Sequence, residues 1–549
     1  MKNKRVMLLS MLLPSVLSIS MLSGCAGNKG ENKQNTASSK KKEQVLNLIE
    51  TDEIPTMDTT KATDAIAFRI MVNTMEGLYR LDKSNKPIPG IAESYTASAD
   101  KKTYTFKLRD ANWSNGDPVT AKDFVYAWRR LVDPKVGAEY AYIMYYVKNA
   151  QKINEGKAAL DSLGVKASGD KTLVVELESP LPESTLIALT TFPSYFPLNE
   201  KFVNAQAGKF GLEAANTLSN GPFTLSDWKH NASFQFAKND TYWDAKTVKL
   251  KKINFNIVKD VSTAVNLYEG GQIDQVSLSS EFVDKYKSSS NFKTEPEATI
   301  FYLRMNLNNP ILKNINARKA IDLAIDKKSL TSVILNNGSK PAYFFVPKDF
   351  VKSPDGKDFR ALNGDFNKTD TKAAKDLWTK AKQELGQQQV TLELLNYDTE
   401  TAKKTGEYLK EQMEKNLEGL TVNIKQQPFK QKLELVRKKE FELSLDGWGA
   451  DYLDAVSYLD IFVSNSPNNS SSYSNPEYDK LISAVKSSLA TDEKARFDAL
   501  LKAEKLLFKD AAISPLYQRG RAIITKPYVK DVYYHQIGGD YSYKWAYID

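Results

Sequence analysis

The chain has 549 residues and a formal net charge of +9. Eight Lys or Arg and two Glu lie in the first 44 residues, so residues 45–549 carry only +3, a balance that argues against nucleic acid as the partner. The length is enough for two or three domains, and 41% hydrophobic residues fit a protein with a packed core.

The first 24 residues have the layout of a secretory signal peptide. Met1–Arg5 carries three positive charges, and an apolar run follows over residues 6–22. This run is interrupted by Pro14 and is shorter than the roughly 20 apolar residues that cross a bilayer, which argues against the alternative of an uncleaved membrane anchor. Leu22-Ser23-Gly24-Cys25 resembles a lipobox, the motif after which bacterial lipoproteins are cleaved and lipidated on the cysteine. Cys25 is also the only cysteine of the chain, so it can form no internal disulfide.

Residues 25–44 consist largely of Lys, Asn, Ser, Gly and Gln. Such a segment buries too little apolar surface to fold, so we expect a disordered tether after the lipidated cysteine. Its basic charge suits a position beside an anionic membrane surface. The amino terminus therefore predicts an extracytoplasmic protein that is lipid-anchored to the outer face of the cell membrane.

Strand and helix signals alternate in the folded part. Residues 103–109 alternate polar and apolar side chains, which indicates a half-buried strand, and residues 115–118 (Asn-Gly-Asp-Pro) follow as a turn. Thr120 is the expected N-cap of the next helix, with Asp123 completing a capping box, and Asp133-Pro134 ends that helix.

Further along the chain, residues 316–335 predict one helix with its C-cap at Asn337-Gly338. Its inner side is expected to carry Ile321, Ala324, Ile325 and Leu330. Residues 171–182 and 252–258 predict strands, and residues 497–510 predict a helix. The chain therefore belongs to the mixed α/β class.

Signals for catalysis are weak. Only two histidines exist, His230 and His535, and they are far apart in the sequence, so we expect no catalytic residues, no metal site and no cofactor. Two fragments of the penicillin-binding signature do occur, Ser98-x-x-Lys101 and Lys404-Thr405-Gly406. The second lies in a helical pattern where that signature requires a strand, and the first spacing recurs elsewhere in this lysine-rich chain, so an extracytoplasmic enzyme is disfavoured.

An unusual stretch late in the chain reads LDGWGADYLDA, residues 445–455. Trp448 lies between two glycines, and Asp451 follows it. Asp454 is the expected N-cap of a helix beginning at Ala455, which leaves Asp451 without a local structural role.

Several of these segments together resemble the oligopeptide-binding lipoproteins of bacterial ABC importers, within solute-binding protein family 5, the peptide- and nickel-type extracellular receptors. The resemblance runs from about residue 45 to the end of the chain. It is carried by four blocks in the right order: YTFKLRDANWSNGDPVTAKDFVYAWRR (104–130), SNGPFTLSDW (219–228) with NDTYWD (239–244), ARKAIDLAIDKKSL (317–330) and GWGADY (447–452).

This resemblance implies a two-lobed, three-domain clamshell of the periplasmic-binding-protein type, with mixed sheets and hinge closure around a ligand held between the lobes. By the family pattern, residues 45–75, 200–302 and 519–549 form lobe I. Residues 76–199 form an extra domain of lobe I, and residues 303–518 form lobe II.

The resemblance also implies the ligand site. Asp451 occupies the position that holds the α-ammonium group of the peptide, and Trp448, Gly449, Ala450 and Tyr452 are expected beside it. Arg437 lies near the place where relatives carry an arginine for the peptide carboxylate, with a register difference of about one residue. Thr63 departs from the family, since some relatives carry an acid there, and Asp64 is the candidate substitute.

The function implied is that of a receptor, not an enzyme, which binds oligopeptides in extended form and delivers them to the membrane permease subunits of an ABC importer. We expect a monomer. The alternative is the same fold specialised for dipeptides, a signalling peptide or a metal chelate.

Overall fold

The computed structural model describes residues 42–464 and 466–549, and residues 43–549 form one compact unit. The predicted signal peptide (1–24), Cys25 and nearly all of the predicted tether (25–44) lie outside the described residues. The fold begins slightly earlier than predicted, because the side chain of Gln44 donates to the backbone carbonyl of Ile548 at 2.6 Å. No helix in the described part is long and apolar enough to cross a bilayer.

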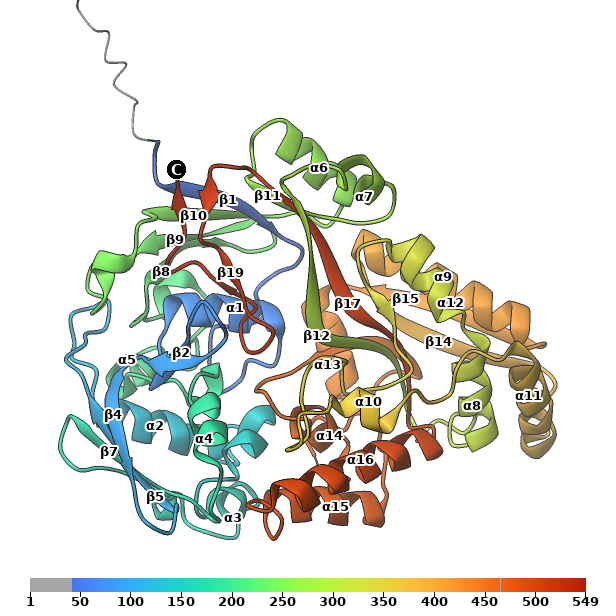
Figure 1. The fold of residues 1–549 in the computed structure, drawn as a ribbon, viewed down its shortest axis with the longest axis horizontal. Helices are drawn as coiled ribbons and strands as arrows, with labels where there is room; N and C mark the ends of the chain where they lie inside the picture. The colour runs from blue at the N-terminus through green and yellow to red at the C-terminus, as the bar shows by residue number, and fades with distance from the viewer. Residues whose placement is uncertain (1–41, 465) are drawn as a thin grey trace, which may run out of the picture. The chain divides into compact units, whose positions relative to one another are not determined.

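The mixed α/β architecture is confirmed, with strands and helices in both halves of the unit formed by residues 43–549 (Figure 1). We use "lobe I" for residues 45–302 and 519–549, and "lobe II" for residues 303–518, following the predicted division. The exact boundaries of that division stay a prediction.

Lobe I contains a four-stranded sheet in the order β1-β10-β9-β8. The first strand pairs in parallel with β10, so residues that are two hundred positions apart lie side by side. Alternate side chains of β1 are buried, among them Leu46 and Leu48, as expected for a strand with one face on the core. The bounds are β1 (Val45–Glu50), β8 (Phe223–Lys229), β9 (Ser233–Lys238) and β10 (Lys252–Ile257).

A second four-stranded sheet of lobe I has the order β4-β5-β7-β6 and packs with helix α2 (Ala121–Val132). The predicted capping box is confirmed, since Asp123 accepts a hydrogen bond from the backbone of Thr120 at 2.8 Å. The helix ends before Asp133, as predicted. The bounds are β4 (Ala92–Ala97), β5 (Thr103–Leu108), β6 (Val165–Ala167) and β7 (Thr172–Glu176).

Two long strands connect the lobes. The chain enters lobe II along β12 (Phe292–Met305) and returns along β17 (Ile513–Thr525), and the two strands pair antiparallel in the middle of Figure 1. They belong to a seven-stranded sheet in the order β11-β17-β12-β16-β14-β15, with β13 also paired to β17. The other bounds are β11 (Gln275–Leu278), β13 (Lys340–Pro341), β14 (Val390–Tyr397), β15 (Leu420–Gln427) and β16 (Leu443–Gly449).

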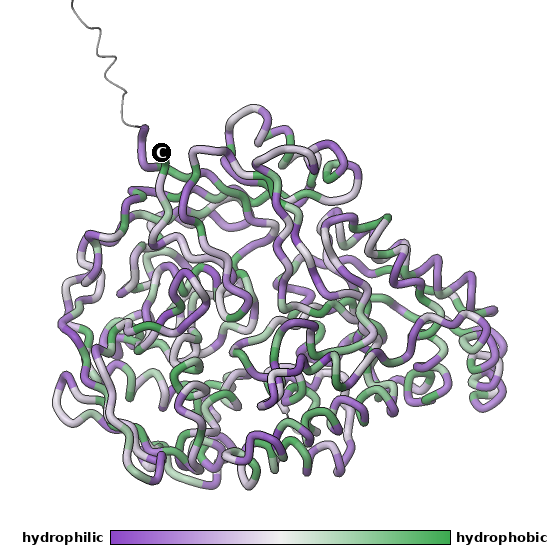
Figure 2. The backbone as a smooth tube through the Cα atoms, in the orientation of Figure 1, coloured by the Kyte–Doolittle hydropathy of each residue, from purple (hydrophilic) through white to green (hydrophobic). Residues whose placement is uncertain are grey.

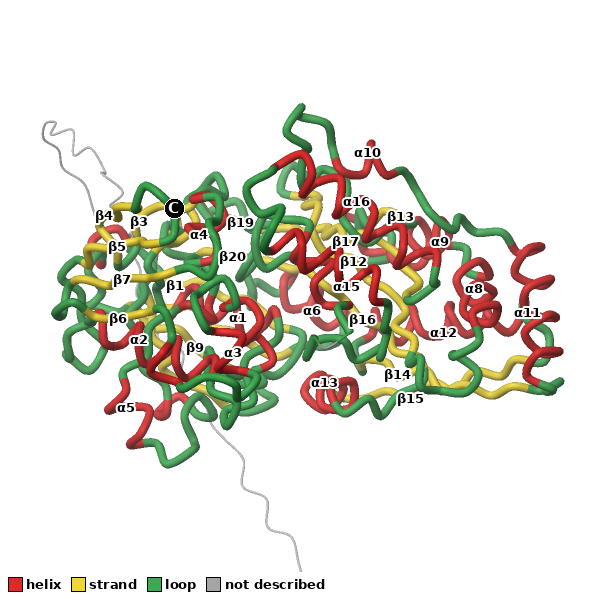
Figure 3. Tube along the Cα trace, turned by 90° about the horizontal axis from the view of Figure 1, so that it is seen from below, coloured by secondary structure: helices red, strands yellow, loops and turns green. Residues whose placement is uncertain are grey.

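Helices cover both faces of this sheet in lobe II. Ile300 and Tyr302 of β12 belong to a buried cluster with α14–α16, whereas Leu303 and Met305 belong to a cluster with α8, α11 and α12. Figure 3 shows the lobe II strands among these helices. In Figure 2, hydrophilic and hydrophobic residues alternate along the outer helices, as expected where one face of a helix packs on the sheet and the other is exposed. The bounds are α8 (Ile315–Ala324), α11 (Thr371–Leu385), α12 (Glu400–Asn416), α14 (Val456–Leu459), α15 (Pro476–Lys486) and α16 (Glu493–Lys509).

The remaining elements are short. Three two-stranded pairs are β2 (Tyr79–Leu81) with β3 (Pro87–Pro89), β18 (Val529–Lys530) with β21 (Tyr547–Ile548), and β19 (Tyr533–Tyr534) with β20 (Tyr541–Ser542). The other helices are α1 (Ala65–Thr74), α3 (Ala150–Asn154), α4 (Glu183–Leu189), α5 (Glu200–Ala205), α6 (Val261–Glu269), α7 (Glu281–Tyr286), α9 (Lys327–Ser329), α10 (Phe359–Asn363) and α13 (Phe429–Arg437).

The predicted single helix over residues 316–335 is wrong. Helix α8 ends at Ala324, Ile325 is extended, and a new segment begins after Asp326 and continues to Leu335. Asp326 causes the break, because its carboxylate accepts hydrogen bonds from the backbone of Lys328 (3.0 Å) and Ser329 (3.2 Å) as an N-cap. The segment ends at Asn336, which has a left-handed backbone, one residue before the predicted C-cap.

Candidate functional site

A cavity of about 460 Å³ lies between the two lobes, beside the connecting strands. Its volume falls in the range of roughly 300–1,000 Å³ that is usual for ligand sites. Lobe I contributes the end of β1, the start of α1, Tyr140 and the loop of the β19–β20 hairpin. Lobe II contributes the end of β16, Tyr397 and Phe429.

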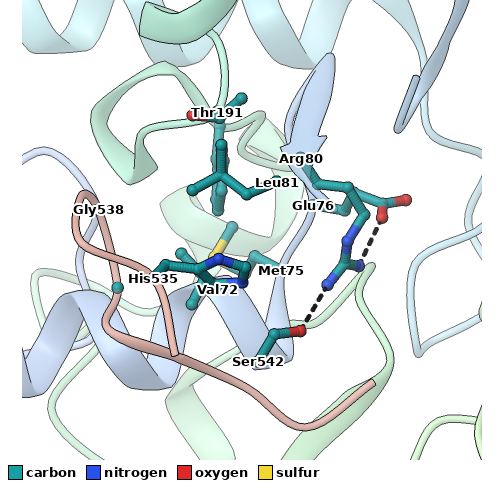
Figure 4. Close-up of a pocket in the computed structure, with 11 residues that line it drawn as sticks. Val72, Met75, Glu76, Arg80, Leu81, Thr191, His535, Gly538 and Ser542 are labelled. Atoms are coloured by element: carbon teal, nitrogen blue, oxygen red, sulfur yellow. Dashed lines mark hydrogen bonds and ion pairs between the residues drawn. The ribbon is translucent and has the colours of Figure 1, made fainter. Parts of the chain in front are cut away.

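A second cavity, of about 30 Å³, lies on the other side of that hairpin loop, and Gly538 lines both cavities. In its wall Arg80 pairs with Glu76 at 2.8 Å and donates to Ser542 at 3.4 Å, with His535 across the space (Figure 4). This space is much smaller than that of the large cavity, so the large cavity is the candidate ligand site.

Asp451 lines the large cavity just beyond β16 and is buried, with 6% of its surface exposed. Its carboxylate accepts hydrogen bonds from the hydroxyls of Tyr140 (3.2 Å) and Tyr142 (3.3 Å), both of lobe I. Its backbone N–H donates to the hydroxyl of Ser457 at 2.8 Å. Over the residues that the structure describes, no lysine or arginine pairs with this carboxylate.

The protonation of this group follows from its surroundings. Burial raises the pKa of Asp451 to about 7, and the hydrogen bonds from Tyr140 and Tyr142 oppose that rise. Burial and the nearby Asp451 charge raise the pKa of both tyrosines, so they remain neutral donors. A buried carboxylate with only neutral donors is costly, and an arriving cation would offset that cost. The position is therefore suited to a positively charged group of a ligand.

The Gly-Trp-Gly stretch lies on β16 against β12. The Trp448 ring stacks on Tyr140, with centroids 6.5 Å apart, and its indole N–H donates to the Ser457 carbonyl at 2.8 Å. A Cβ at Gly447 would lie 2.9 Å from the ring of Phe301, so a larger residue there would displace that ring. Ser457 thus holds both Trp448 and the backbone of Asp451 in place.

One edge of β16 is open beside the cavity. From Leu445 to Gly449 each residue pairs with β12, whereas pairing with β14 stops after Ser444. The backbone groups of β16 on the β14 side are therefore free, within the described residues, to pair with an extended chain. An open strand edge in a ligand cavity is the arrangement that receives a peptide backbone irrespective of its sequence.

The structure brings together some of the predicted site residues. Trp448, Gly449, Ala450 and Asp451 all line the cavity. Tyr452 does not, because it is buried in the core with its hydroxyl 3.5 Å from that of Tyr146.

Arg437 is also outside the cavity lining. It ends α13, about half exposed, and pairs with Glu434 at 2.9 Å and with Glu139 at 3.6 Å. Its predicted contact with a ligand carboxylate therefore receives no support from its position.

Two acids have structural duties. Asp454 accepts a hydrogen bond from the backbone N–H of Val456 at 3.0 Å, and its other carboxylate oxygen pairs with Arg496 at 2.6 Å. The helix itself begins at Val456, one residue later than predicted. Asp64 lines the cavity beside Thr63 and is the N-cap of α1, accepting from the backbone of Ala67 at 2.9 Å. Burial raises the pKa of Asp64 to about 7.

A group of six charged side chains at the cavity was not predicted. Arg69 pairs with Asp540 at 2.7 Å, and Arg521 pairs with Glu297 at 2.8 Å. The sequence signal for part of this group is the Arg-Gly-Arg of residues 519–521, since alternate residues of a strand point to one face. The full group is Glu50, Arg69, Glu297, Arg519, Arg521 and Asp540.

Polar contacts join the lobes at a further place. Lys259 of lobe I lines the cavity and donates to both carboxylate oxygens of Asp398 of lobe II, at 2.8 Å and 2.7 Å. Glu400 accepts from the backbone of Val261 at 2.7 Å. Together with the bonds from Tyr140 and Tyr142 to Asp451, these contacts hold the two lobes in a closed arrangement.

The fold and the inter-lobe cavity are those of a two-lobed binding protein, and comparison with known proteins agrees. Residues 86–470 match the family of bacterial extracellular solute-binding proteins, family 5 (middle region), and the chain belongs to this family. This confirms the predicted family and fold class.

Individual relatives match nearly the whole chain. The dipeptide-binding protein DppE of Bacillus subtilis is 35% identical over 529 residues, which are 96% of each chain. The substrate-binding domain of an oligopeptide ABC transporter from Bacillus anthracis is 53% identical, with a TM-score of 0.90 over 92% of this chain and 99% of that one. Listeria monocytogenes OppA, solved bound to peptide, is 42% identical with a TM-score of 0.89 over the same shares.

Proposed function

We propose that the protein is an extracytoplasmic receptor that binds oligopeptides in extended form and delivers them to an ABC importer. The observation that carries this proposal is the position of Asp451, a buried carboxylate without a cationic partner among the described residues, at the end of an open strand edge in the inter-lobe cavity. Every unmodified peptide has an α-ammonium group and a backbone, so these two features recognise peptides as a class.

Binding follows from this geometry. The α-ammonium group pairs with Asp451, and the peptide backbone pairs with the open edge of β16 between Leu445 and Gly449. The stacked rings of Trp448 and Tyr140 form a wall beside the amino terminus. Closure of the lobes excludes water from these bonds, and lobe I completes the site through Tyr140 and Tyr142.

Several finer features belong to the same proposal. The receptor acts as a monomer, anchored to the outer face of the cell membrane by lipid on Cys25, and passes its cargo to permease subunits in that membrane. It returns the peptide uncleaved, as expected of a binding protein. The name of the Bacillus anthracis relative supports oligopeptides as the cargo, and the Listeria monocytogenes relative was solved bound to peptide. The name of DppE favours dipeptides as the second candidate.

The direct test is to purify the protein under native conditions, incubate it with a mixed pool of free peptides of two to eight residues, and identify the retained peptides by mass spectrometry. Retention of intact peptides with free amino termini supports the proposal. Retention of dipeptides alone favours the second candidate, and recovery of cleaved peptides contradicts a receptor role.

A further inference from the structure

Asp52 follows β1 and lines the large cavity from the side of lobe I. Only 5% of its surface is exposed, so its carboxylate is about as buried as that of Asp451. Its one ionic partner in the described part of the chain is Lys259, whose Nζ lies 3.5 Å from Oδ1. That ammonium group lies closer to both oxygens of Asp398, at 2.8 Å and 2.7 Å. Two carboxylates therefore share one lysine, which leaves one negative charge in excess.

The protonation of Asp52 reflects this shortage of positive charge. Burial raises the pKa of Asp52 to about 7, Lys259 opposes that rise, and the charges of Asp398 and Glu50 add to it. A buried carboxylate in this state gains from a further cation, because the cation stabilises its ionised form. The same reasoning assigned Asp451 to the α-ammonium group of the ligand. The cavity therefore offers a second place for a positive charge.

The other acids of the cavity wall are engaged by the protein. Glu50 and Asp540 both pair with Arg69. Two more acids accept a hydrogen bond from the backbone at the start of a helix, and these are Asp64 of α1 and Asp260 of α6. Apart from the carboxylate assigned to the amino terminus, Asp52 is thus the acid of the described cavity wall with neither a lysine or arginine of its own nor a backbone donor.

Aromatic rings lie near this carboxylate. Tyr397 directly precedes Asp398, lines the cavity and stacks on Phe429, with ring centroids 5.8 Å apart. Burial and the charges of Asp446 and Asp52 raise the pKa of Tyr397, so Asp52 is within electrostatic reach of that ring. Lysine and arginine lay their apolar stems along such rings and carry the charge at the tip. This part of the cavity therefore suits a long side chain with a positive end.

We propose that Asp52 binds the cationic side chain of a lysine or arginine in the peptide, and so determines specificity within the peptide class. This inference rests on the proposed peptide-binding function. The arriving ammonium or guanidinium group pairs with Asp52 while Lys259 stays on Asp398, so that each acid has its own cation. Because the α-ammonium group is held at Asp451, the second cation comes from a side chain further along the extended peptide.

The test uses hexapeptides of alanine and serine with free amino termini. Each carries lysine, norleucine or glutamate at one position, from the second to the fifth. Norleucine matches the apolar stem of lysine and has no charge. Affinities are measured by calorimetry at pH 8, where Asp52 is ionised, for the wild type, Asp52→Asn, Asp52→Glu and Lys259→Met. The control is Asp110→Asn, which removes a charge from a fully exposed side chain.

For the wild type, we expect a position at which lysine binds about tenfold or more tighter than norleucine, and glutamate more weakly than norleucine. Asp52→Asn should lose that preference without weakening the norleucine peptide, and Asp52→Glu should keep part of it because the charge remains. Lys259→Met should increase the preference, since two acids then have no lysine between them. Asp110→Asn should behave as wild type.

The ratio of lysine to norleucine affinity is compared within each variant, so a change in lobe closure that affects both peptides alike does not alter it. Melting temperatures show whether each variant folds. If Asp52→Asn does not fold, Asp52→Ser gives the same comparison.

Three results overturn the inference while leaving the receptor function intact. The first is a wild type that binds lysine and norleucine peptides equally at every position. The second is an Asp52→Asn variant that keeps the lysine preference, which would assign it to another acid. The third is an Asp52→Asn variant that weakens both peptides equally, which would mean that Asp52 only supports the contact between the lobes. A wild type that retains no peptide contradicts the peptide-binding function itself, which is a different outcome.

Discussion

Replacing Asp451 with Asn should stabilise the ligand-free protein while weakening peptide binding. Burial raises the pKa of Asp451 from 3.8 to about 7. Well below pH 3.8 the carboxyl is protonated in both folded and unfolded chains, and its favourable contribution to stability is complete. That contribution is lost as the pH rises to about 7. This rise in pKa of roughly three units corresponds to about 4 kcal/mol of lost stability at pH 8. Because Asn does not ionise, Asp451→Asn should raise the free energy of unfolding of the ligand-free protein by about that amount at pH 8.

The effect on binding has the opposite sign. Removing one partner of a buried charge pair costs about 2–5 kcal/mol, or about 30-fold to several thousand-fold in affinity. The loss should fall on peptides with a free amino terminus. Peptides acetylated at the amino terminus should bind the wild type weakly and should be little affected by Asp451→Asn, because they bring no charge to the site.

Thermal unfolding without ligand at pH 8 and calorimetry with matched free and acetylated peptides measure the two effects. A double-mutant comparison of Asp451→Asn with acetylation gives the coupling energy. If the losses of affinity from acetylation and from Asp451→Asn simply add, Asp451 does not contact the amino terminus. If Asp451→Asn lowers the melting temperature, the buried charge of Asp451 does not destabilise the ligand-free protein. Asp110→Asn is the control, since its side chain is fully exposed. Asp454→Asn is unsuitable, because it would break the pair with Arg496.

Three further outcomes are expected. Affinity for peptides with free amino termini should fall as the pH drops below about 7, approaching tenfold per pH unit, because protonated Asp451 has no charge to pair with the ammonium group. Calorimetry from pH 5 to 8 measures this dependence, and an affinity that does not change with pH would contradict the assignment of Asp451. Lys259→Met should remove the partly exposed ion pair with Asp398, which contributes at most about 1 kcal/mol to holding the lobes together. Small-angle scattering of the ligand-free variant should therefore give a larger radius of gyration, and unchanged scattering would show that this pair does not favour closure. Cys25→Ala should release the protein from the membrane fraction without changing binding by the purified receptor, and continued membrane retention would argue for another anchor.

Much of the fold was predictable because its signals are local. The alternation at residues 103–109 and the capping box of Thr120 and Asp123 depend on neighbours within a few positions, and both predictions are confirmed. The helix predicted over residues 316–335 failed at Asp326, where a local cap competes with the apolar periodicity that runs through it.

The site was predictable only in part. Asp451 could be singled out through the family resemblance of residues 447–452. Its tyrosine partners are 311 and 309 positions away and come from the other lobe, so no local pattern points to them. Gly447, one of the two glycines beside Trp448, lies against the ring of Phe301 on the adjacent strand, a contact that the sequence alone does not reveal.

The two ends of the described chain meet in lobe I, and this affects the order of folding. Gln44 bonds to Ile548 in both directions, at 2.6 Å and 3.1 Å, and β1 pairs with β10 more than two hundred residues later. Lobe II is one continuous segment and can form as soon as it is made, whereas lobe I cannot be completed until the last residues have left the ribosome. Lobe I therefore stays incomplete throughout synthesis, because Gln44 at its start bonds to Ile548 near the last residue of the chain.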